Sequence, residues 1–315
     1  MGTGATFVGL TTLDIAYAVE IYPAEDSKTR AADMFMAAGG PAANAAVAYA
    51  FLARGGAKLA TVLGTHPLTQ PIRADLREFG IEVWDQALDP EQRPPVSSIV
   101  VARESGSRTI VSLDDSRTSG HRELAEGRLL AGARVLLVDG HYPELAVQAA
   151  GMAKDSGVPV VLDGGRWRPE HRKLLPLIDF ALCSSSFTPP ELPPGDVGAL
   201  LDFVLACGPR AVAVTDGARP IRWATTDARG AIPVSNTGAD AVDTDAHAGV
   251  LDTDAHIVDT LGAGDILHGA FCHFHERGED FPTALRHAAE VATFSCRYLG
   301  TREWMRHWRA ATGDA

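Results

Sequence analysis

The chain has 315 residues, enough for one large α/β domain or for a domain with a small appendage. Its formal net charge is −12, which argues against a surface for nucleic acid or an anionic membrane, so we expect neither partner. Four cysteines without CxxC spacing, and a beginning without a basic stretch, predict a reduced cytoplasmic protein without a signal peptide.

Short apolar runs recur along the chain, and each is followed by a helical pattern. The runs lie at 6–10, 58–64, 134–140, 158–164, 179–185 and 210–217. Continuous apolar strands that alternate with helices predict an α/β fold with a mostly parallel central sheet flanked by helices. Several runs end in polar residues, namely Asp139, Asp163, Ser184 and Thr215. Ligands of such sheets bind beyond the carboxyl ends of the strands, so we expect the site there.

Two segments interrupt this alternation. Residues 96–113 predict a β-hairpin that turns at 104–107, whereas residues 15–38 hold no convincing helix. We predict that both segments form a small β-lid on a single domain spanning 1–315. Lids of this kind close over substrates and exclude water.

A short repeat, DTDAH, stands at 243–247 and again at 252–256. Asp and His alternate in it, so a metal site is conceivable, but a duplication in a solvated loop is the plainer interpretation. A zinc site on the helical face of His268, Cys272 and His275 would need a fourth ligand or water. An ordinary helix face is the plainer interpretation of those three residues.

The stretch VDTLGAGD, residues 258–265, brings small residues and a carboxylate to the start of a helical run. Gly262, Ala263 and Gly264 would let backbone N–H groups approach an anion at a helix N-terminus. Asp265 would then sit beside that anion. Phosphoryl transfer needs both parts, because the moving group carries charge and the attacking hydroxyl must lose a proton. The alternative is a capped helix after a glycine turn.

A second stretch, AGGPAANAAVAYAFLA at 38–53, places Gly40 and Pro41 at a predicted helix start. Asn44 falls in the first turn, where its amide could reach the hydroxyls of a ligand. The alanine-rich run predicts a buried helix, since a membrane span needs about 20 strongly apolar residues. A buried helix with a glycine turn is also the alternative to a binding motif.

Together these two motifs resemble the signatures of the PfkB/ribokinase family of carbohydrate kinases. The resemblance runs over roughly residues 5 to 300, and VGLTTLD at 8–14 is similar to the family's first strand. Segments similar to ketohexokinase are 22–30, 107–111 and 257–265, and segments similar to bacterial sulfofructose kinase are 39–48, 161–165 and 265–271. The resemblance implies a ribokinase-like fold and transfer of the γ-phosphate of ATP to a sugar hydroxyl. It also implies Mg²⁺, often with a monovalent cation such as K⁺.

The resemblance further implies roles by position. Asp265 matches the catalytic base, with Gly262, Ala263 and Gly264 as the anion hole. Asp14, Gly40 and Asn44 match substrate contacts, and Arg108 matches a lid arginine near the transferred phosphate. The matches to the nucleotide site are Thr215, Gly217, Ala289, Ala292 and Cys296. Asp259 matches the acid beside which the family often holds its monovalent cation.

One departure concerns the metal. Family members usually carry Asn-x-x-Glu after the strand that here ends LCSSSF, and that motif helps to order magnesium and the phosphate waters. Ser184 and Phe187 stand at the matching positions. Ketohexokinase-like members also depart there, so the change leaves activity open and weakens the expectation of tight Mg²⁺ binding.

A second departure concerns the sugar. Sulfofructose kinase holds its sulfonate with a lysine, an asparagine and an arginine, and the matching positions here are Lys28, Ser112 and His141. Only the lysine remains, and a histidine cannot form the bidentate fork that arginine offers to an anion. His141, after the strand ending at Asp139, could still line the substrate pocket.

We therefore expect a kinase for a neutral sugar, a ketose such as fructose. The alternatives are a sulfofructose or sugar-phosphate kinase, a nucleoside kinase of the same fold, and a catalytically silent sugar-binding protein. A homodimer built through the lid is a further expectation from the resemblance.

Overall fold

The computed structural model describes residues 4–104, 107–113, 118, 120–125, 127–234 and 257–312. Both copies of the DTDAH repeat lie outside these ranges, as do residues 105–106 in the predicted hairpin turn. Within them, no helix combines the length and the apolar character that crossing a membrane requires.

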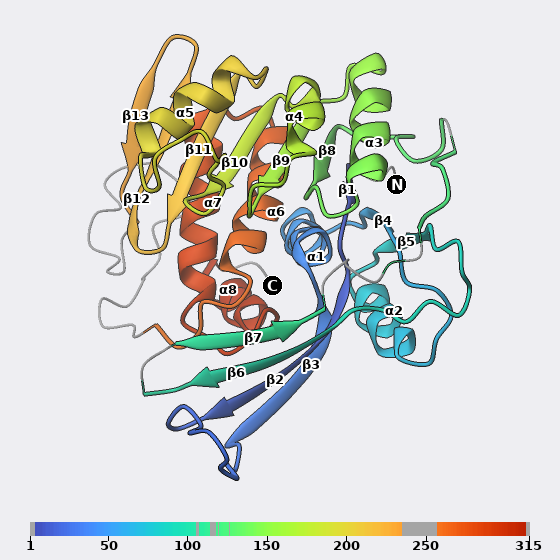
Figure 1. Ribbon diagram of the computed structural model, residues 1–315, viewed down its shortest axis with the longest axis vertical. Helices are drawn as coiled ribbons and strands as arrows, with labels where there is room; N and C mark the ends of the chain where they lie inside the picture. Colours follow the sequence, from blue (N-terminus) through green and yellow to red (C-terminus); the bar gives the residue numbers. More distant parts are fainter. Residues whose placement is uncertain are drawn as a thin grey trace.

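The centre of the protein is a nine-stranded sheet with the order β13-β12-β11-β10-β9-β8-β1-β4-β5 (Figure 1). The strands are β1 (Ala5–Val8), β4 (Lys58–Thr61), β5 (Glu82–Asp85), β8 (Val135–Val138), β9 (Val160–Gly164), β10 (Phe180–Ser184), β11 (Ala211–Asp216), β12 (Arg219–Thr225) and β13 (Arg229–Ile232). The pairs from β5 to β11 are parallel, and β12 and β13 add an antiparallel edge. Each of the six predicted apolar runs overlaps one of the parallel strands, which confirms the predicted fold class.

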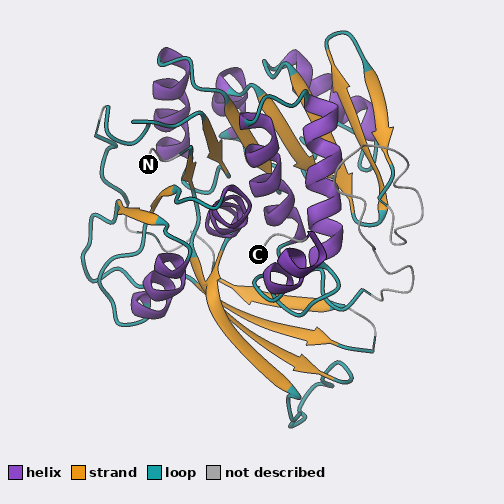
Figure 2. Cartoon of the chain, turned by 180° about the vertical axis from the view of Figure 1, so that it is seen from behind, coloured by secondary structure: helices purple, strands orange, loops and turns teal. Residues whose placement is uncertain are grey.

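Helices cover both faces of this sheet. They are α1 (Pro41–Ala53), α2 (Thr69–Glu78), α3 (Pro143–Asp155), α4 (His171–Leu174), η1 (Leu175–Leu177), α5 (Val197–Ala206), α6 (Ala263–Glu276), α7 (Phe281–Ser295) and α8 (Trp304–Thr312). Successive strand residues point to opposite faces, so Val135 and Leu137 of β8 join the core under α1, α6 and α7. Leu136 and Val138 join the core under α3 and α5. Figure 2 shows α6 and α7 crossing the face turned toward the viewer.

Small residues bring α1 and α6 unusually close together. A Cβ built on Gly269 of α6 would lie 2.2 Å from the carbonyl oxygen of Ala45 in α1. Real Cβ atoms do not approach a backbone oxygen so closely, so only glycine permits this helix crossing. The alanine-rich sequence of α1 is therefore a packing requirement, as well as the start of a predicted site.

A second, four-stranded sheet stands off the main one in the order β3-β2-β6-β7. Its strands are β2 (Thr12–Val19), β3 (Asp33–Gly39), β6 (Val96–Ala102) and β7 (Arg108–Ser112), and β6 and β7 form the predicted antiparallel hairpin. We call this sheet the lid, because it contains both segments for which a lid was predicted. Its inner face, through Ala16, Ile99 and Val101, packs against Leu261 of the main body.

The crossing of α1 and α6 makes a prediction about stability. Gly269→Ala should lower the free energy of unfolding by about 1–3 kcal/mol, because the new methyl group overlaps the Ala45 carbonyl. Thermal unfolding measures this effect as a lower Tm.

The matched control is Gly151→Ala in the interior of α3, where a Cβ would meet no atom within 4 Å. That variant should be neutral or more stable by up to about 1 kcal/mol, because alanine favours helix. Equal Tm changes at the two positions would contradict the packing argument.

Candidate active site

The VDTLGAGD stretch forms a turn that leads directly into α6. Gly262 is the residue before the helix and has φ 69°, in the left-handed region that favours glycine. A side chain there would also meet the Thr301 methyl at 2.6 Å. A Cβ on Gly264, by contrast, would meet no atom within 4 Å. The first turn of α6 thus faces open space with N–H groups that have no acceptor within the helix, which suits an anion.

Asp265 lies in that first turn, half-buried, and accepts a hydrogen bond from Asn44 Nδ2 at 2.8 Å. Burial, and then the nearby Asp163 carboxylate, raise the pKa of Asp265 to about 7, while Asn44 and His268 oppose this rise. A carboxylate with a pKa near the working pH is well suited to remove a proton. The two predicted motifs, far apart in the sequence, thus meet at this residue.

Asn44 is held at both ends of its amide. Its Nδ2 faces Asp265, and its Oδ1 accepts a hydrogen bond from Arg302 Nη1 at 3.1 Å. In the structure the amide of Asn44 binds the Asp265 carboxylate, and the expected contact of Asn44 with the substrate stays a prediction. Sequence reasoning did not single out Arg302, because no local pattern shows which residue will reach Asn44.

Asp14, on strand β2, lies where the lid joins the main body, and its carboxylate is beside Gly39, which leads into α1. Its carboxylate is buried and accepts a hydrogen bond from Thr12 Oγ1 at 2.6 Å, and burial raises its pKa. A Cβ on Gly39 would lie 1.9 Å from Asp14 Oδ2, so the glycine makes room for the carboxylate. The next residue, Gly40, precedes α1 with φ 90°. A Cβ built on Gly40 would lie 2.5 Å from the Leu10 carbonyl oxygen. This arrangement explains both glycines of the motif.

Two more carboxylates line the carboxyl edge of the sheet. Asp139 accepts hydrogen bonds from the backbone N–H groups of Leu10, Ala42 and His141, so it joins the ends of β1 and β8 to α1. Asp163, at the end of β9, is buried, and burial raises its pKa.

The partner of Asp163 is His268, whose Nδ1 lies 3.3 Å from Asp163 Oδ2. The His268 ring also lies between two backbone carbonyls, 2.6 Å from the Gly264 oxygen and 3.0 Å from the Leu182 oxygen. These contacts occupy both ring nitrogens of His268, which the zinc site considered in the sequence would need as a ligand. Among the described residues, no group of three His, Cys, Asp or Glu side chains is placed to hold a metal ion.

Comparison with known proteins shows the family of this chain. The family model described as pfkB family carbohydrate kinase matches residues 3–308. The chain belongs to this family. It is therefore a phosphotransferase with an alcohol group as acceptor, a sugar or nucleoside kinase.

Individual relatives agree with this assignment. Mouse ketohexokinase is 25% identical over 309 residues, which cover 93% of this chain and 96% of the relative. A candidate ribokinase from Agrobacterium tumefaciens superposes with a TM-score of 0.79 at 26% identity, covering 98% of this chain and 99% of the other. Adenosine kinase from Sinorhizobium meliloti shares the fold, with a TM-score of 0.74 at 18% identity and coverage of 99% and 100%.

The pfkB family uses ATP, typically with Mg²⁺, and the structure shows how this chain departs at the metal motif. Phe187, where the family usually has glutamate, is fully buried, and its ring packs against Trp167 and His171. Ser184, where the family has asparagine, donates its hydroxyl to the Gly165 carbonyl. Neither position fits a metal ligand.

The lid arginine of this kinase reaches the signature turn. Arg108 Nη1 donates to Thr260 Oγ1, two residues before Gly262. Beside it, Asp259 is buried and accepts hydrogen bonds from Leu261 N at 2.8 Å and Gly300 N at 2.9 Å. A monovalent cation beside Asp259 stays a prediction.

The residues expected at the nucleotide site lie on β11 and α7. Thr215 lies near the carboxyl end of β11, and Gly217 follows the strand with φ 58°. Cys296 closes α7, and its carbonyl accepts hydrogen bonds from the N–H groups of Val258 and Asp259. Ala289 and Ala292 of α7 are buried in the core. Their contact with adenine stays a prediction.

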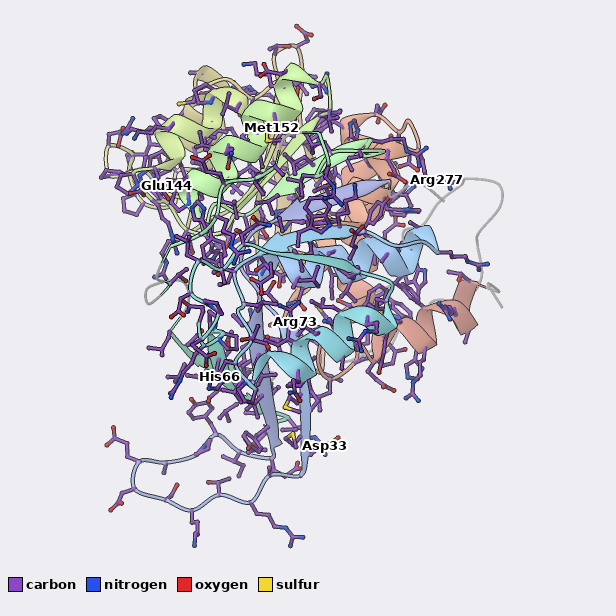
Figure 3. The ribbon with its side chains drawn as sticks, turned by 90° about the vertical axis from the view of Figure 1, so that its right-hand side faces the viewer. Asp33, His66, Arg73, Glu144, Met152 and Arg277 are labelled. Atoms are coloured by element: carbon purple, nitrogen blue, oxygen red, sulfur yellow. The ribbon has the colours of Figure 1, made fainter. Side chains whose placement is uncertain are left out.

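Lys28 and His141, the two residues expected at the far end of the sugar, lie in different parts of the structure. Lys28 is exposed in the loop that joins β2 to β3. In Figure 3 this loop forms the outer tip of the lid, beyond the labelled Asp33. His141 follows β8 at the carboxyl edge, and Arg168 Nη2 lies 3.1 Å from His141 Nδ1. Arginine can only donate, so a hydrogen bond between these atoms requires His141 Nδ1 to accept. Arg168 is a further residue that sequence reasoning missed.

The open space at Gly264 gives a test of the turn. Gly264→Val should keep Tm within a few degrees of the wild type, because a Cβ there meets no atom. Turnover should fall at least about tenfold, since a branched side chain would stand where an anion approaches the helix N-terminus. Steady-state kinetics and thermal unfolding measure the two effects. Normal turnover in a folded variant would make the turn a helix cap only.

Proposed function

We propose that this protein is an ATP-dependent sugar kinase that phosphorylates a primary hydroxyl of a small neutral sugar, a ketose such as fructose. The observation that carries the proposal is Asp265, a half-buried carboxylate with a pKa raised to about 7, in the first turn of α6. The sugar hydroxyl attacks the γ-phosphorus, and its proton passes to Asp265. The bond from phosphorus to the ADP oxygen breaks, and its electron pair stays with ADP.

The surroundings of Asp265 supply the other parts of this reaction. The N-terminus of α6, from Gly262 to Gly264, stabilises the charge on the moving phosphoryl group. Arg108, bonded to Thr260, brings a cation from the lid toward the same turn. Asp14, buried at the junction of lid and main body, is the proposed acceptor for sugar hydroxyls. K⁺ beside Asp259 belongs to the same proposal, and replacing K⁺ by Na⁺ in the assay should slow turnover.

The charges near the site support a neutral substrate. Asp14 and Asp163 both influence the titration of Asp265, so a further anion would enter a region that already holds three carboxyl groups. His141, whose Nδ1 faces the Arg168 guanidinium, lacks the bidentate fork that arginine offers to a sulfonate. The name of the mouse relative supports a ketose. Two observations favour an anionic sugar instead. The guanidinium of Arg168 lies beside His141, and the lid retains Lys28.

A substrate screen decides between these candidates. ADP release should be compared over ketoses, aldoses, sugar phosphates and nucleosides, with kcat/KM measured for fructose, sulfofructose and fructose 6-phosphate near neutral pH. We expect the highest value for fructose. A higher value for either anionic sugar would refute the neutral-substrate argument, and Arg168 and Lys28 would then be the first residues to mutate. A nucleoside preference would favour the nucleoside kinase alternative.

The role of Asp265 predicts both a rate and a pH dependence. Asp265→Asn should lower kcat at least ~10²-fold, the usual contribution of a general base. In the wild type, kcat/KM should rise with pH and level off above about 7, because only the ionised carboxylate accepts the proton and its pKa is raised to about 7. A pH–rate profile measures this.

The control for this prediction is the residual activity of Asp265→Asn, whose kcat/KM should no longer fall at acidic pH. The Tm of this variant should stay close to that of the wild type. Near-normal turnover in Asp265→Asn would remove Asp265 from the role of base.

The lid also supports the expected homodimer. Tyr17, Met34 and Met36 lie on one face of it, because Tyr17 pairs with Met34 and Ile15 with Met36, and all three are exposed. Val111, opposite Ser98, lies on the same outer face and is 69% exposed. An uncharged apolar sheet face is complementary to a second copy of itself, so we propose a symmetric dimer through this face.

Sedimentation should therefore find a dimer for the wild type and a monomer for Met36→Lys. The matched control is Leu88→Lys, an equally exposed apolar residue outside the lid, which should remain dimeric. A monomeric wild type at micromolar concentration would contradict the proposal.

A further inference from the structure

A chain of three polar contacts leads from Asp265 to the surface of the protein. Asn44 Nδ2 donates to Asp265 at 2.8 Å, and Arg302 Nη1 donates to Asn44 Oδ1 at 3.1 Å. The other end of the guanidinium, Arg302 Nη2, lies 3.0 Å from Asp75 Oδ2. The four residues come from α1, α6, α2 and the segment before α8. Neither sequence motif contains Arg302 or Asp75.

The chemistry of the amide makes the Arg302 contact directional. A guanidinium can only donate hydrogen bonds, an amide oxygen can only accept them, and an ionised carboxylate can only accept them. With Arg302 on Oδ1, the amide of Asn44 must turn its N–H toward Asp265. Without Arg302, the amide could rotate and place its oxygen against the carboxylate, which would repel it.

Arg302 is itself held in one place. Its Nη2 also donates to the Ala38 carbonyl at 2.7 Å, and its Nη1 to Thr301 Oγ1 at 2.8 Å. Asp75 in turn accepts from Ala38 N at 3.0 Å, and the guanidinium lies over the Phe79 ring with 5.5 Å from Cζ to the ring centroid. The Arg302 side chain is 18% exposed, so solvent screens its contacts less than those of a surface ion pair. Such a set of contacts fixes the direction of the fork toward Asn44.

We propose that Arg302, anchored by Asp75, is a positioning residue that keeps the Asn44 N–H on Asp265 and so keeps this carboxylate aligned and ionised. The inference rests on the proposed function of Asp265 as the base. It assigns to Asn44 the task of holding the base, in addition to any contact with a sugar.

The charges that face Asp265 give this contact its importance. Burial and the carboxyl groups of Asp163 and Asp14 raise the pKa of Asp265, and the Asn44 hydrogen bond and His268 lower it. Losing the Asn44 contact would therefore move the pKa of Asp265 further upward, and less of the carboxylate would be ionised at neutral pH. A residue that only stabilised the fold would not move this titration.

The same region offers a matched control. A surface pocket of about 650 Å³ is lined by Phe51, Phe79, Arg302, Glu303, Met305, Arg306 and Arg309. Arg306 shares this wall with Arg302 but pairs with Glu303. Arg306→Met therefore makes the same change of charge and shape as Arg302→Met without touching the chain to Asp265.

The test compares Arg302→Met with Arg306→Met by kinetics. Arg302→Met should lower kcat about tenfold near neutral pH and move the acidic limb of the pH–rate profile upward by roughly one unit, since one pKa unit corresponds to a tenfold change. KM for ATP should stay within about twofold of the wild type. Arg306→Met should match the wild type. In an Asn44→Ala background, Arg302→Met should cost less than about twofold more, because it acts through Asn44.

A readout without activity separates this inference from the proposed function. The titration of the Asp265 carboxyl, followed by carbon-13 NMR, should move upward in Arg302→Met and stay in place in Arg306→Met. If the wild type phosphorylates no sugar or nucleoside, the proposed function fails while this titration still tests the contact chain.

An unchanged titration, or an equal loss of kcat with and without Asn44, would overturn the role of Arg302. Should Arg302→Met fail to fold, Arg302→Lys takes its place, because an ammonium lacks the planar fork that reaches Asn44 and Asp75 together. The same upward shift is then expected, and its absence would likewise overturn the proposal.

Discussion

The site depends on the close crossing of α1 and α6. The two helices carry Asn44 and Asp265, and they can approach because Gly269 presents no side chain to the Ala45 carbonyl. At a wider crossing, the amide of Asn44 could not stay 2.8 Å from the Asp265 carboxylate. Packing in the core thus determines the geometry of the polar site at the edge of the sheet. The alanine-rich helix and the GAGD turn are two sides of one contact.

The proposed chemistry follows from placing a carboxylate where ionisation is costly. Asp265 is half-buried and faces Asp163, and the same region holds Asp139 after β8 and Asp14 on β2 of the lid. Burial and like charge hold its pKa near neutrality, whereas the helix N-terminus, Asn44 and His268 stabilise the ionised form. A base balanced in this way can take a proton from a sugar hydroxyl and release it again without a large barrier. A site for a neutral sugar needs no further positive charge.

Much of the architecture was predictable from the sequence, because it depends on local patterns. Uninterrupted apolar runs predicted the parallel strands, and the alternating segment at 96–113 predicted the hairpin of β6 and β7. The two motifs singled out in the sequence lie together in the structure, where Asn44 binds Asp265, while the catalytic role of Asp265 stays a proposal. The contacts of Arg302, Asp75 and Arg168 were not predictable, since they join segments far apart in the sequence. Lys28 lies in the exposed loop between β2 and β3, and its contact with a sugar stays a prediction.

The central claim is that this protein holds Asp265 as a base with a pKa near neutrality. Titration of the Asp265 carboxyl in the wild-type protein, by carbon-13 NMR with Asp265→Asn to assign the signal, tests this claim most directly. The structure predicts a midpoint of about 7, with the carboxylate ionised above it. A midpoint below about 4, the ordinary range of an exposed aspartate, would contradict the claim, because burial and the neighbouring acids would then not tune this residue.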